Sequence, residues 1–344
     1  MLPSPDQLPA TLSRVTQPLD DVDVVITTSG STDGRGHLVG LSLEALLASA
    51  RATLDRLRGP GQWLTSLPVH HVAGFQVVLR SAVAGIAPTV HPRGRPLAES
   101  VAAMLTDVPR YLSLVPTQLV RALETDAGAL AAFSGILVGG AALPPAVAAR
   151  ARDLGLRVVA TYGMTETSGG CVYDGVPLDS VRVRLVDDVV QLAGPVLATR
   201  YLDTAAQPFV SDAGERWLVT ADLGSWEEGR LRVLGRADDV LVSGGVNVHP
   251  RVVEDRLAAT LGGHWAVVGV ADAHWGHLVT AVGEQPVSLE AVREATAVLA
   301  PAERPRAVVV VEGLPHLGSG KVDRRAVREL AAAQLAAGRG ERRR

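Results

Sequence analysis

The first half of the chain alternates short apolar runs with longer amphipathic segments, a pattern typical of strands and helices in a layered α/β fold. A buried strand is expected at residues 22–27. A helix is expected at residues 42–57, where Ser42 would be the N-cap and the leucines fall on one face. The elements in this order predict a doubly wound sheet. Further strands are expected at 63–67, 111–115, 136–138 and 158–160, with helices at 117–123 and 146–154.

After Thr167 the pattern changes to paired strands joined by tight polar turns. Two hairpins are expected here, one turning at Asp187 and Asp188 and the other at Glu228 and Gly229. The first would pair 181–186 with 189–192, and the second would pair Trp226 with 231–234.

A mixed pattern of helices and strands returns at about residue 238. We therefore expect an α/β protein with two domains joined by a hinge. The first, residues 1–236, would combine the doubly wound sheet with a β-hairpin-rich section, and the second, residues 237–344, would be a small α+β domain. In the second domain we expect helices at 250–261 and 289–299, strands at 267–270, 278–282 and 307–311, and a solvated tail at 338–344.

Composition excludes several classes of protein. The 344 residues are 47% hydrophobic and carry a net charge of −3, so no positive field attracts nucleic acid or anionic lipid. No run reaches the roughly 18 apolar residues of a membrane-spanning helix, and the beginning of the chain lacks the pattern of a signal peptide. Cys171 is the one cysteine and cannot form an internal disulfide. We expect a cytoplasmic protein with no nucleic-acid partner and no membrane insertion.

Lys321 is the one lysine among 33 basic residues. A compact ammonium on a flexible stem fits sites where the planar guanidinium of arginine does not, so a lysine retained in an arginine-rich chain is a candidate functional residue. It lies in a glycine-flexed loop at 315–324.

Three other segments carry candidate chemistry. Residues 27–36 are dense in Ser, Thr and Gly and predict a phosphate loop, although their spacing fits neither the dinucleotide fingerprint nor the P-loop of ATPases. Residues 160–167 offer an aromatic ring, a hydroxyl and a carboxylate, which suit a base, a phosphate and Mg²⁺. The alternative for residues 27–36 is an ordinary Ser/Gly turn, and the alternative for residues 160–167 is a strand end with a core tyrosine. Residues 235–250 mark the candidate domain junction.

In this order the four segments resemble those of the adenylate-forming superfamily of acyl-CoA synthetases, luciferases and peptide-synthetase adenylation domains. The similarity runs from about residue 20 to about residue 330. It implies two steps at one site: a carboxylate attacks the α-phosphate of ATP to form an acyl-adenylate, and the thiol of coenzyme A then attacks this intermediate. The matching motifs are the hydroxyl-rich loop, YGxTE at 162–166, the TGD-like segment at 220–222, GRxDD at 235–239 and Gly320-Lys321.

The resemblance also implies roles for individual residues. Lys321 would stabilise charge on the phosphoryl oxygens, Glu166 would hold Mg²⁺, and Thr165 would reach the α-phosphate. Asp222 and Arg236 would bind the ribose hydroxyls. Phosphate contacts would come from Thr28, Ser29, Gly30, Ser31, Thr32 and Arg35, and adenine would be bound by Tyr162, Gly163, Gly139, Gly140 and Ala141.

Family members rotate the small domain between the two steps. Asp238 matches the hinge position, and Ser243, Gly244 and Gly245 would then approach the pantetheine arm of coenzyme A. Taken alone, a simple turn between strand and helix is the better explanation of these glycines. The chain departs from the family in its phosphate loop, which is one residue shorter, lacks a proline and has Arg35 where lysine is customary. Most relatives also have a longer region before this loop, so we expect a truncated N-terminal domain, and a homodimer is one arrangement that would cover the surface left.

The acyl substrate is suggested by the segment after residue 63. His70 and His71 make a poor metal site, because consecutive side chains diverge. The segment resembles 2-succinylbenzoate–CoA ligases of menaquinone synthesis, in which His71 matches a pocket histidine, assigned here to catalysis and acyl binding. Arg80 would pair with the second carboxylate of such a substrate. A ligase for another small aromatic or aliphatic acid, an amino-acid-activating domain and a degenerate nucleotide-binding protein without catalysis are the alternatives.

Overall fold

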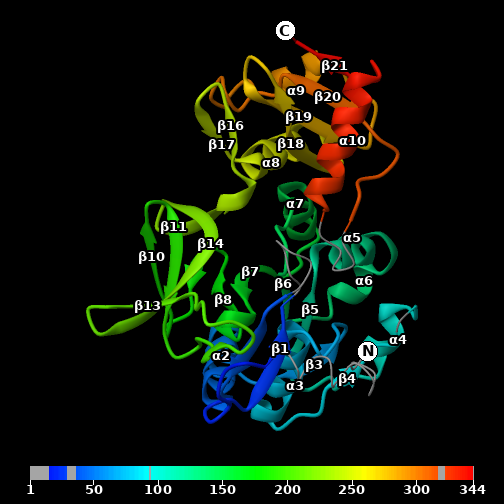
Figure 1. Cartoon of the computed structure of the whole chain (residues 1–344). Helices are drawn as coiled ribbons and strands as arrows, with labels where there is room; N and C mark the ends of the chain where they lie inside the picture. The colour runs from blue at the N-terminus through cyan, green and yellow to red at the C-terminus, as the bar shows by residue number, and fades with distance from the viewer. Residues whose placement is uncertain (1–14, 29–35, 93, 317–321, 344) are drawn as a thin grey trace. The chain divides into compact units, whose positions relative to one another are not determined.

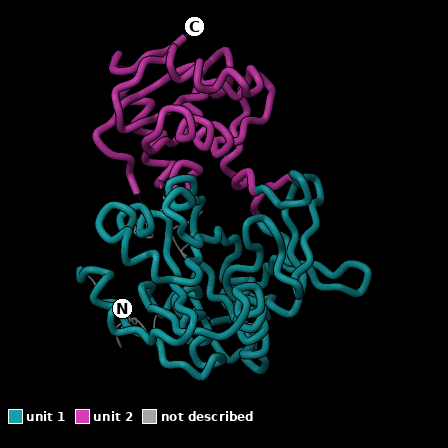
Figure 2. The backbone as a smooth tube through the Cα atoms, turned by 180° about the vertical axis from the view of Figure 1, so that it is seen from behind, with its two compact units in different colours: residues 1–143, 148–220, 226–232 teal, residues 144–147, 221–225, 233–344 magenta. Residues whose placement is uncertain are grey.

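The computed structural model covers the whole chain and describes residues 15–28, 36–92, 94–316 and 322–343 (Figure 1). The chain forms two compact units (Figure 2). Unit 1 comprises residues 1–143, 148–220 and 226–232, and unit 2 comprises residues 144–147, 221–225 and 233–344.

A seven-stranded sheet runs through unit 1 in the order β4-β3-β5-β6-β7-β8-β9. The first five strands are parallel, and β8 and β9 are added as antiparallel neighbours. Because β4 and β5 lie on opposite sides of β3, the strand order reverses there, as in the predicted doubly wound sheet. The strands are β3 (Gln62–Thr65), β4 (Thr89–Val90), β5 (Arg110–Leu114), β6 (Gly135–Val138), β7 (Val158–Met164), β8 (Gly169–Tyr173) and β9 (Val176–Pro177).

Helices connect the parallel strands, as the alternating pattern predicted. Helix α3 follows β3 and packs against it. In β6 the sequence Gly-Ile-Leu-Val is buried throughout, which explains its continuous apolar run. The connecting helices are α3 (Val72–Ala84), α4 (Leu97–Ala102), α5 (Pro116–Thr125), α6 (Ala127–Leu130) and α7 (Pro145–Asp153).

Strand β1 (Val24–Thr27) belongs to a second, three-stranded sheet, which corrects the expectation that it is a buried strand of the large sheet. It pairs antiparallel with β2 (Leu38–Leu41), whose other edge pairs with β12 (Arg200–Tyr201). All four residues of β2 are buried, whereas β1 is an edge strand in which only Ile26 of the four is buried. The apolar run at β1 correctly predicted a strand. An edge strand with one face exposed to solvent buries only the side chains of its other face, here Ile26.

Helix α2 (Leu43–Arg56) follows β2 and begins where the sequence predicted. The Ser42 hydroxyl accepts a hydrogen bond from the amide of Ala45 (3.2 Å), and the Asp23 carboxylate accepts one from the amide of Leu43 (2.6 Å). These acceptors satisfy amides of the first turn that have no partner within the helix. The buried face of α2 includes Leu46, which joins the core cluster around β2.

Both predicted hairpins are present. The turn residues Asp187 and Asp188 have φ of 49° and 63°, and Glu228 and Gly229 have φ of 49° and 75°. Positive φ at both central residues is the geometry that matches the twist of two paired strands. The hairpin-rich sheet has the order β10-β11-β14-β13, with β15 beside β14. Its strands are β10 (Arg182–Val186), β11 (Val189–Ala193), β13 (Phe209–Asp212), β14 (Glu215–Glu227) and β15 (Arg230–Arg236).

Unit 2 contains a sheet of order β17-β16-β19-β20-β21, with β18 beside β19. Alternate residues of β18 and β19 face two different core clusters, one shared with α8 and α9 and the other with α10. Helices therefore cover both faces of this sheet. The elements are β16 (Leu241–Ser243), β17 (Val246–Val248), α8 (Pro250–Leu261), β18 (Trp265–Asp272), β19 (Gly276–Gly283), α9 (Leu289–Ala295), β20 (Ala307–Val310), α10 (Arg324–Ala336) and β21 (Glu341–Arg342).

Two expectations in this unit were wrong. Helix α9 ends at Ala295 instead of residue 299, with Thr296 as its C-cap residue. The Thr296 hydroxyl donates to the carbonyl oxygen of Val292 (2.9 Å), a side-chain bond that competes with continuation of the helix. The tail at 338–344 was also expected to be frayed; residues 338–343 are exposed as expected, but they contain strand β21, which pairs with Ala307 and Val308 of β20. Edge pairing uses only main-chain groups, so charged side chains are compatible with it.

No helix in the described part of the chain is long and apolar enough to cross a membrane. Helix α2, with 14 residues, is shorter than the roughly 20 that such a span takes.

Replacing Leu46 by Ala should lower the free energy of unfolding by about 2–5 kcal/mol, because this fully buried side chain would leave a cavity. Leu43→Ala in the same helix is the matched control, since Leu43 is 46% exposed and should change stability by less than about 0.5 kcal/mol. Urea unfolding followed by circular dichroism measures both. Equal losses would contradict this packing.

Candidate functional site

The hydroxyl-rich loop is closed at its base by Thr28 and His37. The amide of Thr28 donates to the carbonyl oxygen of His37 (2.9 Å), and the amide of His37 donates to Oγ1 of Thr28 (2.8 Å). A Cβ at Gly36 would lie 1.6 Å from the Thr28 carbonyl oxygen, so this position requires glycine. The loop follows a strand as predicted but leads into β2 before the helix. The other predicted loop residues, Ser29, Gly30, Ser31, Thr32 and Arg35, lie outside the described residues.

The residues predicted to bind adenine lie at one edge of the large sheet. Gly139, Gly140 and Ala141 follow β6, and Tyr162 and Gly163 lie near the end of the parallel neighbour β7. The carboxyl ends of parallel strands form the edge at which ligands bind in open α/β sheets. A Cβ at Gly139 would lie 2.3 Å from a side-chain oxygen of β7, and one at Gly163 would lie 2.2 Å from a main-chain oxygen of β8. Close packing therefore explains these two glycines, and Tyr162 is half-buried.

Glu166 lies in a short 3-10 turn, η1 (Thr165–Thr167), between β7 and β8. Its side chain is 8% exposed, and its Oε1 accepts a hydrogen bond from the hydroxyl of Tyr201 (2.6 Å). Its main-chain oxygen accepts a hydrogen bond from the amide of Ala198 (2.8 Å). Both the carboxylate and the backbone of Glu166 are thus held by the segment that contains β12.

Tyr201 also contacts the base of the hydroxyl-rich loop. Its ring stacks on the imidazole of His37 with centroids 4.3 Å apart and 14° between the planes. Nδ1 of His37 lies 3.3 Å from Oδ1 of Asp203. The sequence analysis missed His37, Tyr201 and Asp203. The scarcity of tyrosine, with four in the chain, is the one sequence signal that pointed to Tyr201.

Helix α3 carries the two residues predicted to bind the acyl group, but it separates them. His71 is the exposed N-cap residue, whereas Arg80 lies nine positions later and is 3% exposed. Nine residues of helix span roughly 13 Å, so the two side chains cannot bind the same group. The rings of His70 and His71 lie 4.4 Å apart, and burial lowers the pKa of His70.

Arg80 is a buried cation that has no hydrogen bond or ion pair with any described residue. Its guanidinium lies over the ring of Trp63, 5.0 Å from the centroid. Nε of Arg80 and Nε1 of Trp63 are both buried without a partner in the described structure. Burial lowers the pKa of Arg80 because the charged form loses its hydration. An uncompensated buried charge is costly, so this arrangement favours an anionic ligand here.

Gln76 lies one turn before Arg80 and connects two elements of the site. Its amide nitrogen donates to the main-chain oxygens of Leu46 in α2 (3.1 Å) and Ser168 (2.8 Å). Ser168 directly follows the turn that holds Glu166. Helix α3 is therefore linked to that turn, a contact between residues far apart in sequence that the sequence analysis missed.

In unit 2, Arg236 is paired with Asp238. Nε and Nη2 of Arg236 donate to the two carboxylate oxygens of Asp238 at 2.8 and 2.9 Å. These hydrogen bonds raise the pKa of Arg236 and lower that of Asp238, and the nearby charge of Asp222 also raises the pKa of Arg236. The predicted ribose residues and the predicted hinge residue thus interact electrostatically.

The predicted coenzyme A segment forms the turn between β16 and β17. Ser243 ends β16, and Gly244 and Gly245 have φ of 58° and 79°. A Cβ at Gly244 would lie 2.9 Å from the ring of Trp275, whereas one at Gly245 would meet nothing within 4 Å. Turn geometry and Trp275 explain Gly244 without a ligand.

Lys321 lies outside the described residues, but both flanks of its loop are described. His316 and Val322 form an antiparallel bridge, and the amide of Asp323 donates to the carbonyl oxygen of Pro315 (2.8 Å). The Asp323 carboxylate then caps α10. The lysine loop is therefore closed at its base.

Arg324 anchors the beginning of α10. Its two terminal nitrogens donate to the carboxylate of Glu254 at 2.7 and 2.9 Å, and its Nε lies 3.2 Å from Oδ2 of Asp239. Asp239 follows the predicted hinge residue directly. Burial raises the pKa of Asp239, although the charge of Arg324 opposes this shift.

Two further features lie apart from these residues. Cys171 is fully buried, and burial raises its pKa to about 12, so it is not a thiolate nucleophile at neutral pH.

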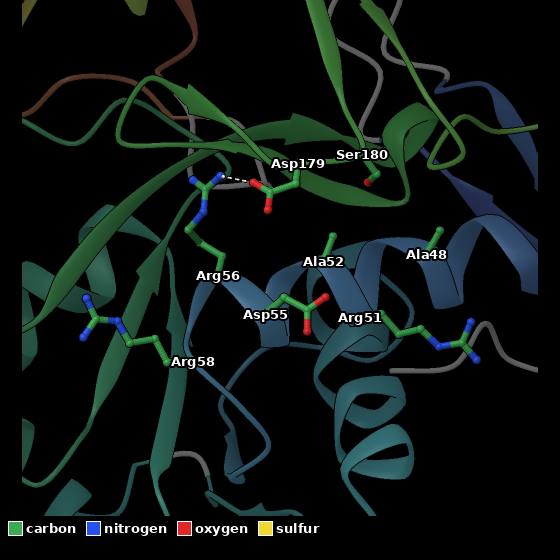
Figure 3. Close-up of a pocket in the computed structure, with 8 residues that line it drawn as sticks. All are labelled: Ala48, Arg51, Ala52, Asp55, Arg56, Arg58, Asp179 and Ser180. Atoms are coloured by element: carbon green, nitrogen blue, oxygen red, sulfur yellow. Dashed lines mark hydrogen bonds and ion pairs between the residues drawn. The ribbon is translucent and has the colours of Figure 1, made fainter.

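A surface cavity of about 470 Å³ adjoins α2, but no predicted site residue lines it (Figure 3). Its Arg56 is already engaged by the carbonyl oxygen of Pro177 (2.6 Å) and by Asp179 (3.4 Å).

Comparison with known proteins gives consistent matches. The model of the AMP-binding enzyme family matches residues 3–201. A probable 2-succinylbenzoate–CoA ligase of Mycobacterium tuberculosis is 42% identical over 335 residues, covering 90% of this chain and 84% of the relative. A 2-succinylbenzoate–CoA ligase of Enterococcus faecalis is 29% identical, covering 88% and 68%.

A solved structure has a similar fold. The o-succinylbenzoate CoA synthetase of Bacillus subtilis, in complex with the acyl-adenylate intermediate, aligns with a TM-score of 0.78 and 26% identity. The alignment covers 90% of this chain and 70% of that chain. The large N-terminal α/β region and the smaller C-terminal region predicted from the sequence are confirmed.

Gly36→Ala should weaken ATP binding at least about tenfold, because the new methyl group would push the base of the hydroxyl-rich loop apart. Gly128→Ala is the matched control, since a Cβ there meets nothing within 4 Å. Calorimetric titration with ATP measures both variants. Unchanged affinity in Gly36→Ala would exclude this loop from the nucleotide site.

Proposed function

Because the chain belongs to the AMP-binding enzyme family, we propose that it is an AMP-forming acid–CoA ligase and that 2-succinylbenzoate is its acid. Support comes from curated relatives of several bacterial groups that share this name, and from the coverage of most of the M. tuberculosis relative. The product would be a coenzyme A thioester for menaquinone biosynthesis.

The reaction would proceed in two steps. A carboxylate oxygen of the acid attacks the α-phosphorus of ATP, and the bond to pyrophosphate breaks. The thiol of coenzyme A then loses its proton and attacks the acyl carbon, and AMP leaves. Bound in one site, the reactants meet in a fixed orientation instead of by collision.

Glu166 suits the predicted role of magnesium ligand. Mg²⁺ is commonly bound through one or two carboxylates together with substrate phosphates, so the site does not need a cluster of acids. Among the described residues no three His, Cys, Asp or Glu side chains lie close enough to form one. Oε2 of Glu166 makes no hydrogen bond or ion pair with a described residue, which leaves it for a cation. When bound, Mg²⁺ would neutralise charge on the phosphates.

The remaining nucleotide contacts are proposed from the family motifs. Thr28 and the loop it begins would hold the β- and γ-phosphates, Thr165 the α-phosphate, and Tyr162 the adenine. Lys321 would stabilise negative charge in the transition state.

The observation that carries the choice of acid is the buried guanidinium of Arg80, which has no hydrogen bond or ion pair with any described residue. A carboxylate on the substrate, distant from the reacting one, would supply the missing anion and hydrogen-bond acceptors. 2-Succinylbenzoate has two carboxylates, so one can be activated while the other binds Arg80. A fatty acid has a single carboxylate, which is the one activated, and so has no second carboxylate for Arg80.

We also assign residues 1–236 to ATP and acyl binding and residues 237–344 to a mobile domain that carries Lys321. Rotation about Asp238 would withdraw the lysine after adenylation and present Ser243, Gly244 and Gly245 to coenzyme A.

The direct test is incubation with ATP, Mg²⁺, coenzyme A and 2-succinylbenzoate, with mass spectrometry of the thioester. Benzoate, succinate and a fatty acid are the comparison substrates. A thioester formed preferentially from another acid would overturn the choice of substrate and keep the ligase.

Arg80→Met should lower kcat/KM for 2-succinylbenzoate about 100-fold, since the ring carboxylate would lose charge-assisted hydrogen bonds. For 4-oxo-4-phenylbutanoate, which lacks that carboxylate, kcat/KM of this variant should equal that of the wild type. Stability should not fall, because the loss of stacking on Trp63 is outweighed by removal of an uncompensated buried charge. An equal loss with both acids would contradict this role for Arg80.

Lys321→Ala should reduce ATP–pyrophosphate exchange driven by the acid about 100- to 1,000-fold, the effect typical of removing one group that stabilises transition-state charge. The melting temperature serves as the control and should not change. Exchange at the wild-type rate would remove the proposed mechanism.

A further inference from the structure

We infer that Tyr201 is a positioning residue that orients the carboxylate of Glu166 toward the metal–nucleotide complex, and that His37 holds the Tyr201 ring in place. This inference rests on the proposed function and assigns a role to a tyrosine and a histidine that lie outside the nucleotide motifs.

The first step is the bond between the two side chains. Glu166 is 8% exposed, and the Tyr201 hydroxyl donates to its Oε1 at 2.6 Å. A hydrogen bond to one oxygen of a carboxylate fixes the rotation of the whole group. The other oxygen, Oε2, then keeps a constant direction, and no described residue bonds it.

The second step is the support of the Tyr201 ring. Arg200 and Tyr201 form β12, which pairs with Gly40 and Val39 of β2, so the backbone position of the ring is set by the small sheet. The face of the ring lies on His37, with centroids 4.3 Å apart.

The imidazole also contacts a carboxylate through its ring edge. Nδ1 of His37 lies 3.3 Å from the carboxylate of Asp203, whose side chain is 10% exposed. The main chain of His37 closes the hydroxyl-rich loop through Thr28. One stacked pair therefore connects the base of the proposed phosphate loop to the proposed metal ligand.

The third step is that the backbone of Glu166 is anchored independently of its carboxylate. The main chain of Glu166 is held independently, because its carbonyl oxygen accepts the amide of Ala198 (2.8 Å). Removing the Tyr201 hydroxyl would therefore leave this main-chain hydrogen bond of η1 in place and remove the one that orients the carboxylate. The effect should therefore appear where Mg²⁺ and ATP act together, and not in the binding of ATP alone.

The experiment measures ATP binding by calorimetry with and without saturating Mg²⁺, using the full-length protein without acid or coenzyme A. The ratio of the two dissociation constants is the magnesium coupling. Tyr201→Phe should leave ATP affinity without Mg²⁺ within twofold of the wild type and lower the coupling about tenfold, the loss expected for a hydrogen bond to a charged group. In the adenylation assay it should lower kcat and leave KM for the acid unchanged.

Tyr111→Phe is the matched control. It removes the hydroxyl of another tyrosine, which is shared between the carbonyl oxygens of Leu57 and Gly59 at 3.1 Å. Neither of these residues is assigned to the nucleotide site. Magnesium coupling in this variant should equal that of the wild type.

His37→Ala is the second variant, and its 48% exposed side chain makes it well tolerated by the fold. It should lower the coupling about threefold by releasing the ring. In the Tyr201→Phe background the same change should have no further effect, because the hydroxyl through which His37 acts is already gone.

A coupling unchanged in Tyr201→Phe, or a loss of ATP affinity that is equal with and without Mg²⁺, would overturn this inference. Independent effects of the two changes, which multiply in the double variant, would overturn the part assigned to His37. The wild type separates this result from failure of the proposed function: no ATP binding with Mg²⁺ present would overturn both.

Discussion

The pairing of β2 with strands on both of its edges is the constraint on which the candidate nucleotide site depends. One edge of β2 pairs with β1, and this closes the hydroxyl-rich loop through Thr28 and His37. The other edge pairs with β12, and this places Tyr201 beside His37 and within reach of Glu166. Three segments far apart in the sequence meet because one fully buried strand lies between them.

Arg80 illustrates how a residue proposed to bind substrate can oppose stability. A guanidinium that is 3% exposed has lost most of its hydration, and the ring of Trp63 replaces only a part of it. A protein selected for stability alone would have a methionine or leucine at this position. The charge is tolerated because the surrounding core supports it. In the role proposed for Arg80 it would make the site selective, since an acid without a second carboxylate would leave the cation unpaired.

Local patterns in the sequence predicted most elements of the fold. The N-cap of α2 at Ser42, the two-residue turn at Asp187 and Asp188 and the extent of α8 depend on residues close together in the chain, and the structure has them where they were expected. The assignment of β1 to the large sheet failed, because its apolar run shows that it is a strand but not which strand it pairs with. The prediction of a tail without secondary structure at 338–344 was wrong for a related reason. Strand β21 is formed by main-chain hydrogen bonds, which the side chains do not reveal.

The same distinction applies to the candidate site. Glu166, Tyr162 and Asp222 lie in motifs that are contiguous in sequence, so a resemblance to known enzymes could identify them. Tyr201, His37 and Gln76 were missed because their contacts join distant positions: Glu166 and Tyr201 are 35 residues apart, and His37 and Asp203 are 166 apart. A contiguous motif identifies the residue expected to bind the ligand. Which residues orient that side chain depends on how the strands and helices pack. Their identity can therefore vary while the ligand-binding residue stays the same, provided that the replacement fixes the same oxygen in the same direction.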